Sequence, residues 1–153
     1  MSRLAVSVVV VLVVAAGFLV WVRVAPTDAA RWHVDPETAP KPSSKNWAVT
    51  GPNEKHAAPN YALTAADLAA RFDSFALQQP RTRRIGGSPA EGQMTYEVRS
   101  KLVGYPDFVS VKAIDLGNGT STLALFSRSR FGYGDQGVNA KRLRDWLRAF
   151  NPA

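Results

Sequence analysis

Three glycines near the C-terminal end of the sequence have the spacing of a nucleotide-binding loop. Gly132, Gly134 and Gly137 form a G-x-G-x-x-G pattern between an expected strand and an expected helix. A dinucleotide site also needs a parallel strand after the helix and an acidic ribose ligand about 20 residues further on. Here the helix is expected to be the last element, and Asp135 lies inside the loop, where its carboxylate opposes a phosphate and caps the helix. We therefore interpret the glycines as a sharp turn, and we expect no cofactor.

A second group of candidate residues is basic and is spread over three expected strands. Strict alternation predicts that five side chains share one face of the sheet: Arg99, Lys101, Lys112, Arg128 and Arg130. Such groups bind phosphate or carboxylate, and Arg can form two parallel hydrogen bonds to either. The five residues are a candidate site for an anionic ligand. The alternative is a solvated face partly neutralised by Glu97 and Asp107, or a face covered by a helix that buries the arginine stems.

Residues for catalysis or metal binding are few. His33 and His56 lie in a Pro-rich segment without carboxylates at ligand spacing, so we predict no metal site. The expected folded part contains no histidine, which argues against a serine hydrolase, and we assign no catalytic residue. A hydrolase-like enzyme that uses Asp135 and Glu97 with nearby arginines on a phosphorylated or carboxylated substrate is the weaker alternative, because nothing sets these carboxylates in a defined pair.

The turn after the last strand must be held in place by its neighbours. Asn139 and Arg142 lie three residues apart at the start of the expected final helix, beside Asp135. We expect these side chains to hold the glycine loop by hydrogen bonds.

The elements that position these residues follow from periodicity. Thr64 and Asp67 predict the start of a helix, and apolar residues at steps of three and four continue it to Ala76. Alternation predicts strands near 95–102, 108–115 and 120–130, with a further short strand near 82–86.

The Gly-Asn-Gly sequence at 117–119 predicts a hairpin. A three-residue loop aligns Val109, Val111 and Ala113 with Leu123 and Leu125 on the apolar face; a two-residue loop shifts this register by one residue. We prefer the first register. With an apolar stripe on the final helix, the sequence predicts an α+β fold, an antiparallel meander of three to four strands packed with two helices.

The N-terminal region predicts a membrane anchor. From Leu4 to Val22 there are nineteen uncharged residues, nine of them valine, enough for a helix that spans a bilayer. A cleaved signal peptide is the alternative, but its apolar region is usually about 7 to 15 residues long. We therefore expect a single-pass protein of a bacterial inner membrane, with the C-terminal domain in the periplasm.

Composition divides the chain into three parts. Residues 1–24 are the expected transmembrane anchor, residues 25–60 carry six prolines and are expected to form a tether, and residues 61–153 form the folded domain. The absence of cysteine excludes disulfides and thiolate metal sites.

Several short motifs resemble a known family. These are Thr95–Ser100, Tyr105–Val111, Ser127–Arg130 and the run from Gly134 to Asn139 followed by Arg142. Together they resemble the bacterial and plastid family called domain of unknown function 1499. The resemblance covers about the last sixty residues, with a looser match around Pro59–Tyr61. It implies an N-terminal membrane segment or export signal and no particular activity.

The charge balance favours anionic partners. The chain has a formal net charge of +7, and its sequence pI is about 10.1. For an anchored domain outside the cytoplasm we expect no nucleic acid, and instead a lipid headgroup, a wall component or an acidic protein surface. The sequence thus favours a membrane-anchored binding or assembly module over an enzyme.

Overall fold

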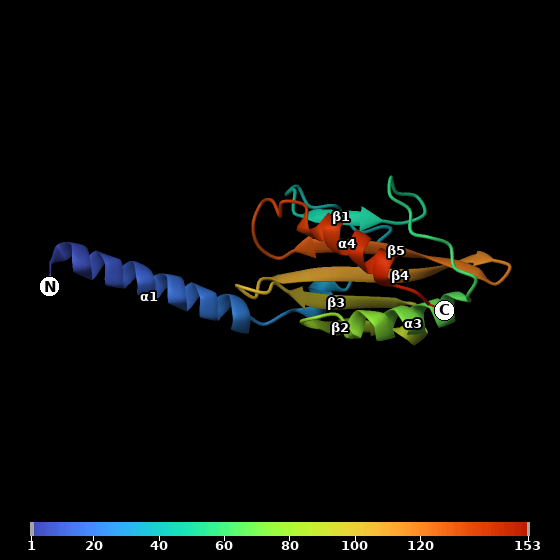
Figure 1. The fold of residues 1–153 in the computed structure, drawn as a ribbon, viewed down its shortest axis with the longest axis horizontal. Coiled ribbons are helices and arrows are strands. Elements are labelled where there is room, and N and C mark those ends of the chain that lie inside the picture. Colours follow the sequence, from blue (N-terminus) through green and yellow to red (C-terminus); the bar gives the residue numbers. More distant parts are fainter. Residues whose placement is uncertain (1, 153) are drawn as a thin grey trace.

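The computed structural model describes residues 2–152 and contains an α+β domain from which one long helix projects (Figure 1). The helices are α1 (Arg3–Val24), α2 (Ala29–Trp32), α3 (Ala65–Leu77) and α4 (Val138–Ala149). The strands are β1 (Trp47–Thr50), β2 (Thr82–Ser88), β3 (Gln93–Arg99), β4 (Pro106–Gly117) and β5 (Thr120–Ser129). They form one antiparallel sheet in the order β1-β5-β4-β3-β2. The predicted α+β class is confirmed, with one strand more than expected.

Helix α1 is the candidate membrane-spanning helix. Its 22 residues correspond to about 33 Å, close to the ~30 Å hydrocarbon core of a bilayer. Nearly all of its side chains are exposed, and Val22 near its C-terminal end is the one buried residue. Length and apolar composition thus qualify α1 as a candidate for single-pass anchoring.

Helix α3 begins where the sequence predicts. The Thr64 hydroxyl accepts a hydrogen bond from the Asp67 amide at 3.1 Å, which satisfies one of the free N–H groups of the first turn. Leu68, Phe72 and Ala76 recur on one face of the helix and are fully buried. This face fixes α3 on the sheet.

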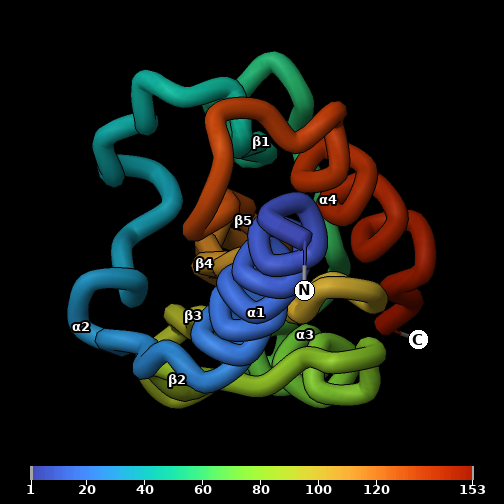
Figure 2. Tube along the Cα trace, turned by 90° about the vertical axis from the view of Figure 1, so that its left-hand side faces the viewer, coloured from blue at the N-terminus to red at the C-terminus, as the bar shows by residue number. Residues whose placement is uncertain are grey.

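The main hydrophobic core lies between the sheet and the two helices α3 and α4. Figure 2 shows α3 and α4 on one side of the sheet and the segment after α1 on the other. The strands contribute alternate residues to this core, since successive side chains of a strand point to opposite faces. The core residues from the strands are Met94, Tyr96, Val98, Val109, Val111, Leu123 and Leu125. Leu143, Trp146 and Phe150 close it from the α4 side.

The β4–β5 hairpin has the predicted register, although its loop is shorter than expected. Val111 pairs with Leu125 and Ala113 with Leu123, as predicted. The loop, however, contains two residues, Asn118 and Gly119, both with positive φ. A bulge between Asp115 and Gly117 adds one residue to β4 and so compensates for the shorter loop. The apolar pattern of the strands determined the register, and the bulge accommodates it.

The Pro-rich segment differs from the expected tether. Its residues 29–38 lie on the sheet face opposite to α3 and α4, where the Trp32 ring stacks on Phe108 at 3.9 Å between centroids. Further along, Trp47–Thr50 pairs with β5 as the edge strand β1. This strand was not predicted because four residues among prolines show no clear alternation. The proposed boundaries at residues 24 and 60 stay predictions.

Candidate functional site

The predicted basic face is covered. Arg99, Lys112 and Arg128 do project from the face opposite to α3 and α4, as alternation predicts. The segment 25–44 lies over this face, so the covered alternative describes it better than the solvated one. The cover is an irregular chain with the one-turn helix α2, whereas the covered alternative had assumed a helix.

Arg128 is buried beneath this cover. Its guanidinium group donates hydrogen bonds to the Trp32 carbonyl at 2.5 Å and to the Ser110 hydroxyl at 3.2 Å. It also lies over the rings of Trp32 and Phe126, at 5.4 and 4.6 Å from their centroids. Burial lowers the Arg128 pKa to about 10, which still leaves the group charged at neutral pH. In this arrangement, Arg128 holds the segment on the sheet.

Lys112 is neutralised by the same segment. Its ammonium group lies 2.7 Å from Asp35 and 2.9 Å from Glu37. The hydrogen bonds that Lys112 donates to Asp35 and Glu37 raise the Lys112 pKa. Burial alone would raise the Asp35 pKa, but the hydrogen bond and charge of Lys112, with backbone donors, outweigh burial and lower it. Lys112 thus faces two acidic partners from its own chain.

Arg99 and Lys101 lie instead at the end of the sheet from which α1 leaves, beside an open cavity of about 530 Å³. The cavity is lined by five cationic side chains and one carboxylate, a formal excess of four positive charges. Its lining consists of Arg23, Arg81, Thr82, Arg83, Glu97, Arg99, Ser100, Lys101 and Gly104. We call this the basic cavity. It joins the end of α1, strand β2 and the β3–β4 connection.

Glu97 is the centre of the basic cavity. Its side chain is 1% exposed and accepts hydrogen bonds from Arg83 at 2.7 Å, Arg99 at 2.5 Å and Thr27 at 2.8 Å. Burial alone would raise the Glu97 pKa, but hydrogen bonds from Arg83 and Thr27 and the charges of Arg99 and Arg83 outweigh burial and lower it. Glu97 is therefore ionised at neutral pH and fixes two of the arginines.

Three of the cationic residues in this cavity were missed by sequence reasoning. Arg81 and Arg83 belong to the run Arg-Thr-Arg-Arg at 81–84, and Arg23 immediately follows the apolar stretch of α1. The basic run was a usable signal, but the strand near 82–86 had no assigned partner. Pairing of Arg83 with Glu97 across β2 and β3 brings the run to the cavity.

Arg128 and Arg130 line a second cavity, of about 420 Å³, between β5 and the segment 31–44. Arg31 also contributes to it. Arg130 donates a hydrogen bond to the Pro26 carbonyl at 3.0 Å and lies over the Phe131 ring. This cavity has fewer cationic groups than the basic cavity, and Arg128 is turned towards backbone oxygen atoms.

The glycine loop makes a turn with left-handed backbone at Gly132 and Gly137, with φ of 87° and 80°. The Asp135 carboxylate accepts hydrogen bonds from the amides of Gly137 and Asn139 at 3.0 and 2.8 Å. Burial alone would raise the Asp135 pKa, but these donors and the Asn139 side chain lower it. Gly134 forms a bridge to Lys45. The backbone N–H groups at the start of α4 thus donate to the Asp135 carboxylate of the same loop.

Asn139 and Arg142 extend this arrangement into a buried polar network. Asn139 donates to the Asn46 carbonyl at 2.9 Å and accepts a hydrogen bond from Ser127 at 2.6 Å. Arg142 pairs with Asp107 at 2.5 Å and donates to Ser127 at 3.0 Å. The network connects α4 to β4, β5 and the residue before β1.

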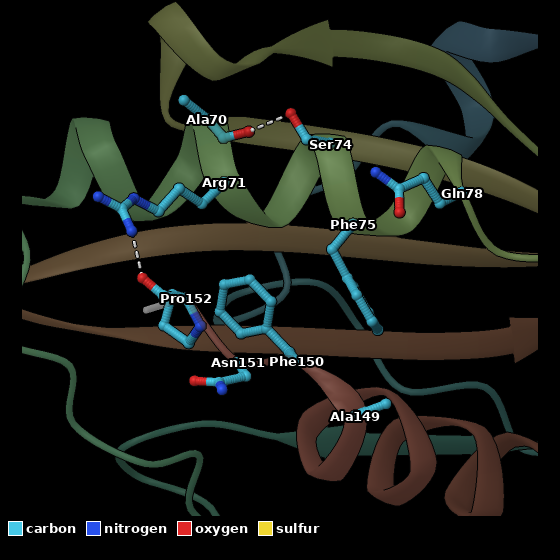
Figure 3. Close-up of a pocket in the computed structure, with 9 residues that line it drawn as sticks. All are labelled: Ala70, Arg71, Ser74, Phe75, Gln78, Ala149, Phe150, Asn151 and Pro152. Atoms are coloured by element: carbon cyan, nitrogen blue, oxygen red, sulfur yellow. Dashed lines mark hydrogen bonds between the residues drawn. The ribbon is translucent and has the colours of Figure 1, made fainter.

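A cavity of about 530 Å³ also lies between the C-terminal half of α3 and the residues at the C-terminal end of α4 (Figure 3). Figure 3 shows Arg71 reaching across it to the Pro152 carbonyl, with the Phe75 and Phe150 side chains between the two helices. Among its lining residues, Arg71 is the one charged side chain. This cavity offers little for catalysis or anion recognition. Within residues 2–152, no cluster of three or more His, Cys, Asp or Glu side chains is placed to hold a metal ion.

A comparison with known families identifies the family of this chain. The profile of a family described as protein of unknown function (DUF1499) matches residues 32–150. The chain belongs to this family. The matched range of DUF1499 starts at Trp32, so it includes the covering segment as well as the sheet, α3 and α4. It also confirms the resemblance carried by the motifs between Thr95 and Arg142. The chain matches no curated protein and no solved structure.

Proposed function

We propose that this DUF1499 protein is a membrane-anchored module that binds an anionic, phosphate-bearing ligand in the basic cavity. The observation that carries this proposal is the gathering of Arg23, Arg81, Arg83, Arg99 and Lys101 around one buried carboxylate. Two of these residues, Arg99 and Lys101, are among the five predicted from the sequence. Arg83 donates to Glu97 through Nη2, and Arg99 donates to Glu97 through Nε and to the Val22 and Gly104 carbonyls through Nη1. A guanidinium group has five N–H donors, so each arginine has further donors for a ligand.

The cavity suits recognition better than chemistry. A general acid would need a carboxyl pKa raised towards neutrality, whereas the pKa values of both Glu97 and Asp135 are lowered. Glu97 is also occupied by three donors from the protein. The ligand class follows from the cationic side chains, because arginines bind phosphate oxygens with charge-assisted hydrogen bonds.

Glycerol 3-phosphate is a suitable soluble probe for this proposal. The full chain in non-ionic detergent is titrated with it by isothermal calorimetry. The test variant combines Arg81→Gln and Lys101→Gln, both at exposed positions. Because it removes two cationic contacts, we expect about a tenfold or larger loss of affinity. Arg144→Gln with Arg148→Gln, on α4, is the matched control for net charge and should bind like the wild type. Equal affinity in both double variants, or no binding by the wild type, would contradict the proposal.

We also propose that the domain lies on the periplasmic side of a bacterial inner membrane, with α1 as its single span. The support is that the charges on the two sides of the apolar stretch, Arg3 before it and Arg23, Asp28 and Arg31 after it, are nearly balanced, so they do not oppose an orientation in which α1 leads the domain outwards. A reporter fused to the C-terminus tests this placement.

A further inference from the structure

We infer that the end of the domain around α1 rests on the bilayer that α1 crosses, and that the phosphate in the basic cavity therefore comes from an anionic phospholipid. This inference rests on the proposed function and names the source of its ligand. It is argued from the exposed apolar residues at this end, from its charge, and from the way α1 is joined to the domain.

Two loops flank the end of α1. Figure 2 looks onto this end and shows α1 rising from it between the β3–β4 loop and the glycine loop. Leu102 in the first loop is 83% exposed and Tyr133 in the second is 70% exposed. Among the described residues outside α1, these are the two most exposed large hydrophobic side chains. Their position on loop tips is unfavourable in water and favourable at a membrane interface, where tyrosine is enriched.

The depth of these loops follows from their contacts with α1. The uncharged stretch ends at Val22, so Arg23 belongs at the level of the lipid headgroups. Arg23 donates a hydrogen bond to the Leu102 carbonyl at 2.8 Å. Trp21 packs on Phe131 of the glycine loop, with ring centroids 5.4 Å apart. Both loops are thus tied to the residues of α1 that mark the membrane boundary.

The connection between α1 and the domain is also close-packed. Val22 is fully buried, and its carbonyl accepts a hydrogen bond from Arg99 at 3.3 Å. Gly104 has a φ of 83°, and a Cβ atom there would lie 3.1 Å from the Arg23 side chain. These contacts hold the domain against the end of α1, so the loops cannot swing far from the bilayer.

The charge at this end complements an anionic membrane surface. Lys101 neighbours Leu102, and Lys45 donates its backbone amide to the Tyr133 carbonyl at 2.7 Å. Both lysines are exposed, and the basic cavity opens beside Lys101. The acidic residue of the glycine loop, Asp135, is occupied by the amides of α4. Basic residues close to an anionic bilayer are attracted to its surface.

The lack of native cysteine allows a direct test by single spin labels. Leu102→Cys, Tyr133→Cys and the control Leu116→Cys, near the β4–β5 turn at the far end of the sheet, each receive a nitroxide in the full chain. The protein is placed in nanodiscs of phosphatidylcholine with phosphatidylglycerol. We expect the labels at 102 and 133 to gain access to oxygen and lose access to a water-soluble nickel complex, while the label at 116 stays accessible to nickel. Equal nickel access at all three positions would overturn the inference.

A second arm identifies the source of the phosphate. Native mass spectrometry of the full chain released from these nanodiscs should show bound phosphatidylglycerol. The variant with Arg81→Gln and Lys101→Gln should lose this lipid. The control with Arg144→Gln and Arg148→Gln should keep it. If glycerol 3-phosphate binds but the labels stay in water, the ligand is a soluble phosphate and the docking inference is wrong. If the labels enter the lipid but glycerol 3-phosphate does not bind, docking holds and the proposed function fails.

Discussion

A single buried carboxylate, Glu97, organises the basic cavity. It accepts hydrogen bonds from two arginines and one threonine, and these come from three separate parts of the chain. Without Glu97, the guanidinium groups of Arg83 and Arg99 would repel each other in a partly buried place. Glu97 thus lowers the electrostatic free-energy cost of gathering these cationic side chains, and the cavity keeps a net positive charge.

Replacing this carboxylate should produce a pH-dependent loss of stability. We expect Glu97→Gln to lower the free energy of unfolding by about 2–3 kcal/mol at pH 7, since it removes charge-assisted hydrogen bonds. The folded-state pKa of Glu97 lies below its ordinary value of 4.5, so its contribution is complete above pH 4.5 and is lost as pH falls through the lower value. Urea unfolding of the full chain in detergent at pH 7 and pH 3 measures this difference.

The exposed Glu91→Gln is the control for that measurement, because it removes a carboxylate from the turn between β2 and β3 without breaking a buried contact. It should change the stability little at either pH. A wild-type advantage over Glu97→Gln that is the same at pH 7 and pH 3 would show that the carboxylate charge is not the cause.

At the scale of elements, the covered sheet face explains the position of Arg128. Strands β4 and β5 present Phe108, Ser110 and Arg128 on the side away from α3 and α4, and the segment 25–44 provides Trp32 to cover them. A proline-rich chain has few backbone donors for a regular sheet or helix, so side chains attach it instead. The family match begins at Trp32 and so includes the part of this segment that contacts the sheet.

Arg128→Met should release this segment while keeping much of the side-chain volume. The variant loses the hydrogen bonds to the Trp32 carbonyl and the Ser110 hydroxyl. Because each charge-assisted bond contributes about 1.5–3 kcal/mol, we expect amide hydrogen exchange of residues 29–38 to become about tenfold to a hundredfold faster. Arg130→Met is the matched control, because it loses a single exposed hydrogen bond, to the Pro26 carbonyl. Unchanged protection in Arg128→Met would mean that Arg128 does not hold the segment on the sheet.

At the scale of the whole molecule, the arrangement along the long axis is asymmetric. The candidate membrane helix, the basic cavity and the two loops with exposed apolar tips all lie at one end, and the β4–β5 hairpin lies at the other (Figure 1). Because the basic cavity and α1 lie at the same end, the proposed ligand site is next to the proposed membrane anchor.

The side of the membrane is a property of the whole chain and can be tested directly. Alkaline phosphatase, which is active in the periplasm, is fused after Ala153 of the full chain. We expect an active fusion, because in the proposed orientation the residues before α1 stay in the cytoplasm and α1 leads the domain outwards. A green fluorescent protein fusion at the same position is the complementary control. An inactive phosphatase with a fluorescent counterpart would place the domain in the cytoplasm and make nucleic acid a partner to consider.

The sequence by itself determined the local elements of this protein. The capping residues at Thr64, the alternation of β3 to β5 and the apolar stretch of α1 each follow from neighbouring residues, and short-range geometry is enough to interpret them. Arg99 and Lys101 were named as anion-binding candidates from the sequence, and that role stays a prediction. Tertiary structure alone decided that Arg23 and Arg81 join them and that the Pro-rich segment covers Arg128. These contacts join residues more than fifty positions apart or strands whose pairing no local pattern specifies, so they exist only once the chain has folded.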